Sequence, residues 1–446
     1  RDDVMPILRD NCASCHSGEG VGAHVWELAS ARDAADVASG LALVTGADYM
    51  PPWPASGKSV PLADERRLSE SEKQAIVDWA QGGGKLDVDE STPIAAPART
   101  PSDFTPNLRL TLSEPYVGSS DQVDDYRCFI LEPAFTEATW IRGYTFVADE
   151  PSIVHHALGF RVDAAAADSF RAKDAQSPES GWDCDGNGAM GGQFMAWAPG
   201  QDPTVFPDGT ALRFEPGTAL VAQIHYHFGA HAAPPDQSHF EFLTSTDPDL
   251  APVDYRVLLA PAEIPCRAGL EEGPLCDRTA AKADASARLD PLAGVVADFL
   301  NQRCGATPAD YASMTDGVAS ASCEHRIRRD AEAIAVFGHM HEIGETFRMT
   351  LNPGTANEKV LLDIPRWDFG WQLNYRFAQP VRLAQGDTIK VECSWDRAHL
   401  RVPEARYILW SEGTADEMCY SALTLVPTPG QASGGRDTQA AVGVPR

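Results

Sequence analysis

The sequence predicts a multidomain chain in which a small helical domain is followed by all-β domains. Its 446 residues suffice for about three domains, each large enough to bury its own core. Helical patterns are concentrated before residue 90. Beyond that point short alternating apolar runs are separated by many turns, in a chain that contains 36 Gly and 33 Pro.

The overall composition excludes several classes of partner. The formal net charge is −28 and no cluster of Lys or Arg stands out, which argues against nucleic acid and anionic membranes. No apolar run approaches the length of a membrane span, so we expect no transmembrane segment. The chain starts at Arg1 and not at Met, so we expect that a leader or anchoring segment was removed or is missing.

The ten cysteines fall into two groups. Cys12 and Cys15 lie close together, whereas the other eight are scattered and even in number. Such a set predicts disulfides and therefore an oxidising location, periplasmic or secreted; eight buried free thiols are the alternative. The eight scattered residues are Cys128, Cys184, Cys266, Cys276, Cys304, Cys323, Cys393 and Cys419.

Residues 1–90 contain a pattern for haem attachment. Cys12-Ala13-Ser14-Cys15-His16 is a C-x-x-C-H motif, in which two thiols form thioethers to the haem and the histidine binds its iron. A zinc half-site and a redox dithiol are the alternatives. Neither explains the short helix that residues 4–8 predict directly before the motif.

Two features downstream also fit a haem segment. Met50 lies in a proline-bounded loop that suits a sixth iron ligand, with His24 and Met5 as weaker alternatives. Ser69 begins a capped amphipathic helix that we expect to end at the glycines from residue 82. The segment therefore resembles a small class I cytochrome c, and the resemblance implies an all-α domain with one covalently attached haem c.

Changes in composition place the remaining boundaries. The segments are a Pro/Ala-rich linker, two β domains and a Gly/Pro/Ala-rich tail expected to be disordered, at residues 91–104, 105–249, 250–428 and 429–446. An insertion at about 266–328 interrupts the second β domain with a helical pattern and four cysteines. Proximity alone suggests the pairs Cys266 with Cys276 and Cys304 with Cys323.

Two histidines one residue apart indicate a metal site in the second β domain. The apolar run at 335–338 predicts a strand leading into His339 and His341, and residues i and i+2 of a strand face the same side. Met340 between them should point away. Imidazoles without carboxylates favour copper or zinc. Without further ligands, two surface histidines at a strand end are the alternative.

The first β domain carries two more histidine motifs. His155 and His156 are adjacent in a predicted strand, so both reach one metal only at a bulge or strand end, or by using different ring nitrogens. One core and one exposed histidine is the alternative. A later strand ends in His225-Tyr226-His227 and offers a third ligand. Only one of these histidines is needed, and the other faces solvent or supports the site.

The motifs in order are His-His, His-Tyr-His, His-Met-His and Glu-Met-Cys. This series resembles the copper type II, ascorbate-dependent monooxygenases, the family of peptidylglycine α-hydroxylating and dopamine β-monooxygenases, over residues 105–427. The resemblance implies two jelly-roll-like β-sandwich domains with one copper each. The implied ligands are His155, His156 and His225 for an electron-transfer copper, and the catalytic His339, His341 and Met418 for an oxygen-activating copper.

The resemblance also bears on disulfides and substrate. It implies the pairs Cys393 with Cys419, which fixes the strand of the ligand methionine, and Cys128 with Cys184. Peptide-hydroxylating members carry a substrate-binding Arg and Tyr where this chain has Phe337 and Ala422. These two positions and Tyr420 form the candidate substrate pocket. We therefore expect a neutral or aromatic small molecule, not a peptide with a C-terminal glycine.

The ligand types fit C–H hydroxylation, R–H + O2 + 2e⁻ + 2H⁺ → R–OH + H2O. Three imidazoles hold copper in either oxidation state, whereas two imidazoles and a thioether favour Cu(I), the form that must meet O2. We expect an external donor, ascorbate or a redox protein, and a haem segment that replaces or relays for ascorbate. The alternatives are a non-catalytic copper-binding or electron-transfer protein and a zinc-dependent hydrolase.

Overall fold

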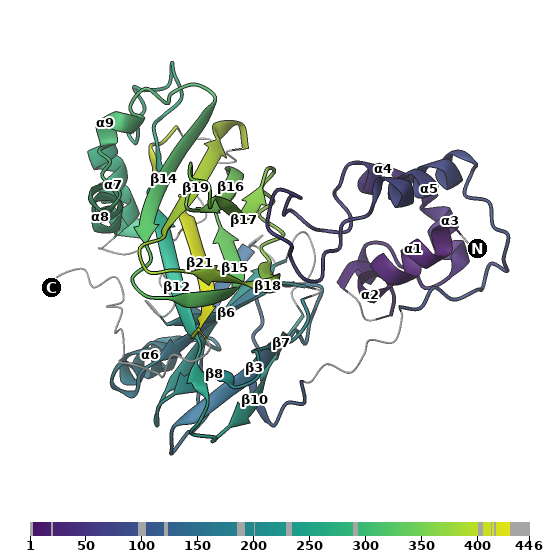
Figure 1. The fold of residues 1–446 in the computed structure, drawn as a ribbon, viewed down its shortest axis with the longest axis horizontal. Helices are drawn as coiled ribbons and strands as arrows, with labels where there is room; N and C mark the ends of the chain where they lie inside the picture. Colours follow the sequence, from purple (N-terminus) through teal and green to yellow (C-terminus); the bar gives the residue numbers. More distant parts are fainter. Residues whose placement is uncertain are drawn as a thin grey trace.

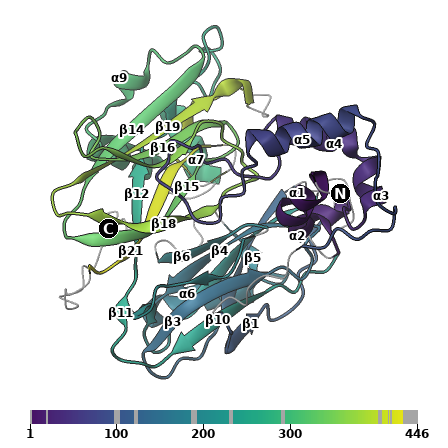
Figure 2. The same ribbon diagram turned by 45° about the vertical axis from the view of Figure 1, so that its right-hand side comes forward.

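The protein is described here from a computed structural model. It describes residues 3–18, 21–96, 104–119, 124–184, 192–199, 201–228, 234–288, 293–399, 405–411, 413 and 416–428. The predicted tail at 429–446 and residues 97–103 of the predicted linker lie outside these residues. Figures 1 and 2 show a helical N-terminal segment beside two stacks of β-sheets.

The first stack of sheets, the first sandwich, carries one histidine cluster. One of its sheets contains β2 (Asp124–Leu131), β4 (Val154–Val162), β5 (Trp182–Asp183), β6 (Gln193–Trp197) and β9 (Ala219–His227), in the order β5-β2-β9-β4-β6. The other contains β1 (Leu108–Thr111), β3 (Thr139–Val147), β7 (Thr204–Val205), β8 (Thr210–Phe214), β10 (His239–Ser245) and β11 (Ala251–Pro252), in the order β1-β10-β3-β8-β11 with β7 on β3. Buried aromatic residues from both sheets, such as Phe214, Tyr226 and Phe242, fill the space between them. Helix α6 (Ala164–Gln176) packs through Ala167 with residues of β2 and β9 in a smaller buried cluster.

The second sandwich follows directly. One sheet contains β12 (Asp254–Ala260), β15 (Ala331–His339), β18 (Asn374–Leu383) and β21 (Cys419–Val426), in the order β12-β21-β15-β18. The other contains β14 (Val318–Arg326), β16 (Gly344–Leu351), β17 (Lys359–Ile364) and β19 (Thr388–Asp396), in the order β14-β19-β16-β17. Its core includes the fully buried Trp395 and Phe347.

The predicted insertion forms a helical layer on the second sandwich. It contains α7 (Arg278–Arg288), α8 (Ala293–Arg303) and α9 (Pro308–Tyr311), which lie together along one side in Figure 1. Three short elements complete this sandwich: the paired strands β13 (Glu263–Ile264) and β20 (Ile408–Leu409), and the 3-10 turn η2 (Arg397–His399).

The N-terminal segment contains short helices. These are α1 (Val4–Asn11), α2 (Ala13–His16), η1 (Val21–His24), α3 (Ala31–Asp36), α4 (Ala38–Gly46) and α5 (Glu70–Gln81). The predicted capped helix is confirmed, because Ser69 and Glu72 form a capping box at the start of α5 and Gly82 caps its end. Ile7, Leu28 and Ile76 contribute to a small core of this segment.

The predicted fold class, however, is wrong in its separate small all-α cytochrome c domain. Among the described residues the structure is mainly β, with about 21% helix, and their N-terminal part forms no clear all-α domain. Residues 53–64 run beside β17 and β18. Ser56 and Val60 donate backbone hydrogen bonds to the carbonyls of Asp363 and Val360, at 2.7 and 2.8 Å. The proline-bounded loop around Met50 is predicted to serve the haem segment, but Trp53 at its end packs against the core of the second sandwich.

Four disulfides form among the described residues, and they are the four expected pairs. They join Cys128 to Cys184, Cys266 to Cys276, Cys304 to Cys323 and Cys393 to Cys419. Such bridges fit a secreted protein of an oxidising compartment. Within the described part of the chain, the helices are too short or too polar to cross a membrane.

Candidate metal centres

The first histidine cluster forms where β4 and β9 pair. His156 lies directly opposite His225, and the register shifts between Val154 and His156. This irregularity turns the side chain of His155 to the same site as that of its neighbour, which a regular strand would forbid. One ring nitrogen from each of the three histidines lies within 4.8 Å of the others. The backbone of His227 ends β9, and its side chain lies outside the described residues.

The spacing of this cluster suits a metal ion. Nδ1 of His156 is 3.2 Å from Nδ1 of His155 and 3.4 Å from Nδ1 of His225. Nitrogens bound at about 2.0–2.1 Å to one tetrahedral metal lie roughly 3.3 Å apart. Tyr126 stacks on the ring of His225 at 4.2 Å and supports its orientation.

The second cluster forms at the end of β15. The rings of His339 and His341 are 5.1 Å apart. His339 pairs with Tyr420 on β21, and Met418 lies directly before the start of that strand. Met418 is buried in the core of the second sandwich next to the disulfide at Cys419. Met340 is also fully buried in that core.

Each histidine of the second cluster is held through its Nδ1 atom. Nδ1 of His341 donates to the backbone oxygen of Asp416 at 3.1 Å, and Nδ1 of His339 donates to Oε1 of Gln372. Burial lowers the pKa of His339 to about 4 and that of His341 to about 3. Both rings are therefore neutral at pH 7, and each has its Nε2 lone pair as the nitrogen suited to a metal.

Glu417 fixes the backbone of the second cluster, a role that the Glu-Met-Cys motif alone did not predict. Its carboxylate accepts hydrogen bonds from the backbone N–H groups of His341, Ile343 and Met418, at 2.9, 2.9 and 3.2 Å. The indole of Trp395 donates a fourth at 3.0 Å. Burial raises the pKa of Glu417 to about 8, and the N–H donors oppose this shift. One fully buried side chain thus fixes the backbone around two predicted ligands.

The two clusters face each other across the boundary between the sandwiches. The ring of Phe369 lies 6.4 Å from that of His155, 6.1 Å from that of His225 and 6.5 Å from that of His341. Burial and the neighbouring histidines, including His339 of the other cluster, hold the pKa of His156 well below its usual range. The motifs do not predict this proximity, because Phe369 belongs to neither of them.

The three candidate pocket residues also meet at this boundary. Phe337 and Ala422 are buried in one apolar cluster, with Tyr420 packed against it. The rings of Phe337 and His339 are 6.3 Å apart, and Tyr420 lies 6.1 Å from His339. Ala196 from the first sandwich completes the buried cluster. The surface beside the second histidine cluster is therefore apolar and aromatic.

The haem-attachment motif occupies one helical turn. Cys12 and Cys15 are free thiols, and Nδ1 of His16 donates to the carbonyl oxygen of Trp26 at 2.9 Å, which presents Nε2 to an iron. A Cβ added to Gly22 would lie 2.7 Å from the imidazole, so this ring is packed against backbone. Burial and the neighbouring Cys15 raise the pKa of the Cys12 thiol to about 12. The residues present therefore fit one covalently attached haem.

The predicted sixth ligand lies elsewhere in the segment. Met50 lines a cavity of about 290 Å³ with Trp53, Arg366 and Trp371, and the cavity lining does not include His16. Met5 lies on α1, and the side chain of His24 is outside the described residues. The structure thus brings Met50 to the second sandwich.

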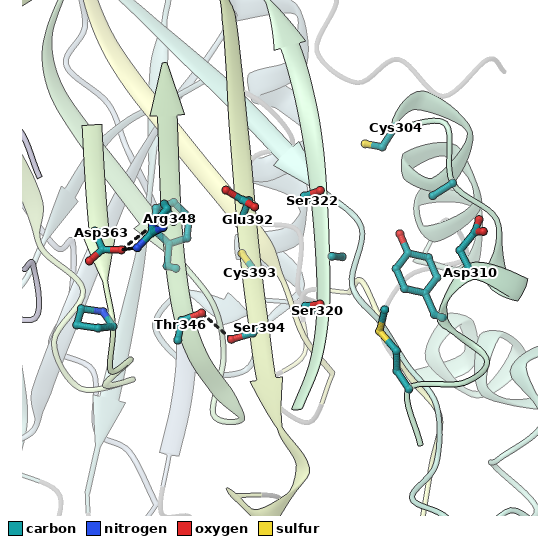
Figure 3. A pocket seen from close by; sticks show the side chains of 16 residues that line it. Cys304, Asp310, Ser320, Ser322, Thr346, Arg348, Asp363, Glu392, Cys393 and Ser394 are labelled. Carbon is teal, nitrogen blue, oxygen red and sulfur yellow. Dashed lines mark hydrogen bonds and ion pairs between the residues drawn. The ribbon is translucent and has the colours of Figure 1, made fainter. Parts of the chain in front are cut away.

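A larger cavity of about 690 Å³ lies on the outer face of the sheet β14-β19-β16-β17, under α9. Figure 3 shows the ion pair of Arg348 with Asp363 and the hydrogen bond between Thr346 and Ser394 in its wall. Its lining includes no histidine of either cluster.

Comparisons with known proteins identify no family. No family model matches the chain, and no curated protein matches it. Among solved structures, the infectious bursal disease virus Gx strain aligns at 11% identity and a TM-score of 0.18, over 76% of this chain and 77% of that one. Oxalate decarboxylase from Bacillus subtilis aligns at 9% and 0.14, over 74% and 78%. A two-domain protein of unknown function from Bacteroides fragilis aligns at 7% and 0.15, over 71% and 94%. At these TM-scores the likeness assigns neither fold nor function.

Proposed function

We propose that this protein is a copper-dependent monooxygenase that hydroxylates a C–H bond of a small neutral or aromatic substrate with O2. The observation that carries the proposal is the meeting of two histidine clusters, from three separate segments, on either side of Phe369. A protein that only stores copper has no need of two unlike sites that face each other. The copper monooxygenases that the sequence resembles use this division of ligand types.

The residues that would hold the two metals differ in kind. His155, His156 and His225 supply imidazoles alone. In this proposal the second metal takes the imidazoles of His339 and His341 and, as a third ligand, the thioether of Met418. When bound, the two coppers supply one electron each to R–H + O2 + 2e⁻ + 2H⁺ → R–OH + H2O. The protein's own part is to keep the imidazoles of His156, His339 and His341 neutral by burial and to hold the rings at fixed angles.

The substrate pocket that we propose is the apolar cluster at Phe337, Tyr420 and Ala422. An aromatic or aliphatic molecule loses water favourably against these side chains, whereas a free carboxylate would find no cation among them. The pocket residues sit beside His339, so a bound C–H bond would be held next to the second cluster.

The electrons, in this proposal, come from an external one-electron donor, ascorbate or a redox protein, through a haem attached at Cys12, Cys15 and His16. The location follows as periplasmic or secreted, since both the haem attachment and the disulfides belong to oxidising compartments. Replacing Cys15 with Ala should remove the haem attachment and slow hydroxylation driven by a protein reductant. Unchanged turnover would contradict a role of the haem in electron delivery.

The test of the function is metal analysis combined with O2 consumption. We expect two coppers and one haem per chain, and O2 consumption by the reduced, copper-loaded protein that depends on substrate. Met418→Ile should leave one copper bound and abolish hydroxylation. Met349→Ile, in the core of β16, is the matched control and should leave both intact. Activity that does not depend on O2 and reductant, or a different metal content, would contradict the proposal.

A further inference from the structure

The loop between β17 and β18 contacts both histidine clusters and the N-terminal segment. We call residues 366–373 the bridging loop. At its start, Arg366 donates to the carbonyl oxygens of Ala47 and Asp48, both at 3.3 Å. Next, the indole of Trp367 donates to the backbone oxygen of His341 at 3.1 Å. A Cβ added to Gly370 would lie 3.6 Å from Nε2 of His155, so the loop backbone also passes close to the first cluster.

Near the end of the loop, the side chain of Gln372 contacts His339. Its Nε2 atom donates to the carbonyl oxygen of Phe369 at 2.9 Å, so the amide nitrogen faces the loop and Oε1 faces the imidazole. An amide oxygen only accepts hydrogen bonds. Nδ1 of His339 must therefore carry the proton, and Nε2 carries the lone pair. Gln372 is buried, which holds this arrangement away from water.

We propose that Gln372 is a positioning residue that fixes the tautomer and the ring angle of His339 for metal binding. This inference rests on the proposed function, since it assigns His339 to a copper site. Hydrogen bonds from two residues of the bridging loop hold the second cluster: Gln372 contacts the ring of His339, and Trp367 contacts the backbone of His341. The loop is itself tied through Arg366 to residues 47 and 48 of the N-terminal segment.

The alternative is that Gln372 only satisfies a buried N–H group and has no bearing on the metal. The two views predict different results for a variant in which another hydrogen-bond acceptor replaces the amide of Gln372. Gln372→Glu keeps an oxygen at the same reach, and a carboxylate behind a ligand histidine strengthens it as a ligand. Gln372→Leu removes the acceptor at similar volume and frees the ring to change tautomer or rotate.

The experiment compares these two variants with the full-length protein. In the metal-free protein, ¹⁵N NMR should show His339 protonated at Nδ1 in wild type and in Gln372→Glu, and a mixture of tautomers in Gln372→Leu. Competition with a chromophoric Cu(I) chelator should show that Gln372→Leu weakens one of two copper sites by about tenfold or more, and that Gln372→Glu restores it. The control is Gln237→Leu, which removes an amide-to-carbonyl hydrogen bond to Leu112 in the first sandwich and should leave both affinities unchanged.

Equal tautomers and equal copper affinities in wild type and Gln372→Leu would overturn the inference. Loss of affinity in both Gln372 variants would also overturn it, since the acceptor would then not matter. Failure of the proposed function is seen separately, because wild type would then bind no copper at this cluster. The NMR result on the metal-free protein still tests Gln372 in that case.

Discussion

The histidines of the two clusters present different ring nitrogens to a metal. In the first cluster the Nδ1 atoms of His155, His156 and His225 converge, with two separations of 3.2 and 3.4 Å. In the second, Nδ1 of His339 and of His341 is bonded to the protein. Hydrogen bonds to Gln372 and to the backbone of Asp416 orient the second pair, and in the first cluster Tyr126 stacks on the ring of His225. We expect the second site to be sensitive to substitution of Gln372.

A buried histidine outside both clusters gives a pH prediction. Nε2 of His325 on β14 donates to the carbonyl oxygen of Leu259 at 2.9 Å, and burial lowers its pKa to about 4. The folded state thus binds the proton less readily than the unfolded state, whose His pKa is about 6.5. Neutral His325 therefore contributes to the free energy of unfolding, and this contribution is complete above pH 6.5. It falls by about 3 kcal/mol in all as the pH decreases toward 4.

Urea unfolding of the metal-free protein at a series of pH values measures this. Wild type should lose stability relative to His325→Gln between pH 6.5 and 4, because the amide keeps a donor for Leu259 and does not titrate. A constant difference between the two proteins across this range would contradict the assignment.

At the scale of elements, the predictable features were those set by local pattern. The capping box at Ser69 predicted the start of α5, and alternation predicted strands that end at His227 and His339. The bulge at His155 is one of the arrangements that the sequence left open for two adjacent histidines, beside a strand end and the use of different ring nitrogens. Gln372 and Glu417 were missed as supports because their partners lie far along the chain, and no periodicity links them.

The insertion is another element whose role only packing reveals. Its helix α7 contributes Arg288, which donates to the buried carboxylate of Asp416 at 3.1 Å, while Arg406 is 3.9 Å from the same group. Asp416 in turn supplies the carbonyl that holds His341. The insertion therefore braces the chain directly before Met418.

Replacing Arg288 with Met should destabilise the protein by about 3 kcal/mol, because it leaves Asp416 buried with little compensation. Asp416→Asn in the same background should recover part of the loss, as a double-mutant cycle would measure. The control is Arg171→Met, which removes an exposed pair with Glu132 on the first sandwich and should have a much smaller effect. Equal effects of the two arginine changes would refute the bracing role.

At the scale of the whole molecule, the N-terminal segment and the second sandwich share a core. Trp53 packs edge-on against Tyr375 of β18 at 5.2 Å, and Ala55 is buried in the same cluster. Leu62 forms an antiparallel bridge with Phe377. Helical and proline signals in the sequence suggested a self-contained haem domain. A stretch of proline-rich chain that pairs with a distant strand has no local signature, which is why the domain prediction failed.

This shared core predicts that a substitution in the N-terminal segment lowers the stability of the second sandwich. Trp53→Ala should weaken the second sandwich by about 2 kcal/mol, since it opens a partly buried cavity beside Tyr375. Backbone amides of β17 and β18 should then exchange hydrogen roughly thirtyfold faster, as mass spectrometry would detect. Trp79→Ala is the matched control. Trp79 packs within the helical cluster and donates to the carbonyl of Lys85, so its loss should speed exchange in α4 and α5 only. If Trp53→Ala left β17 and β18 unchanged, the N-terminal segment would be an independent unit after all, and its link to the bridging loop would be a surface contact.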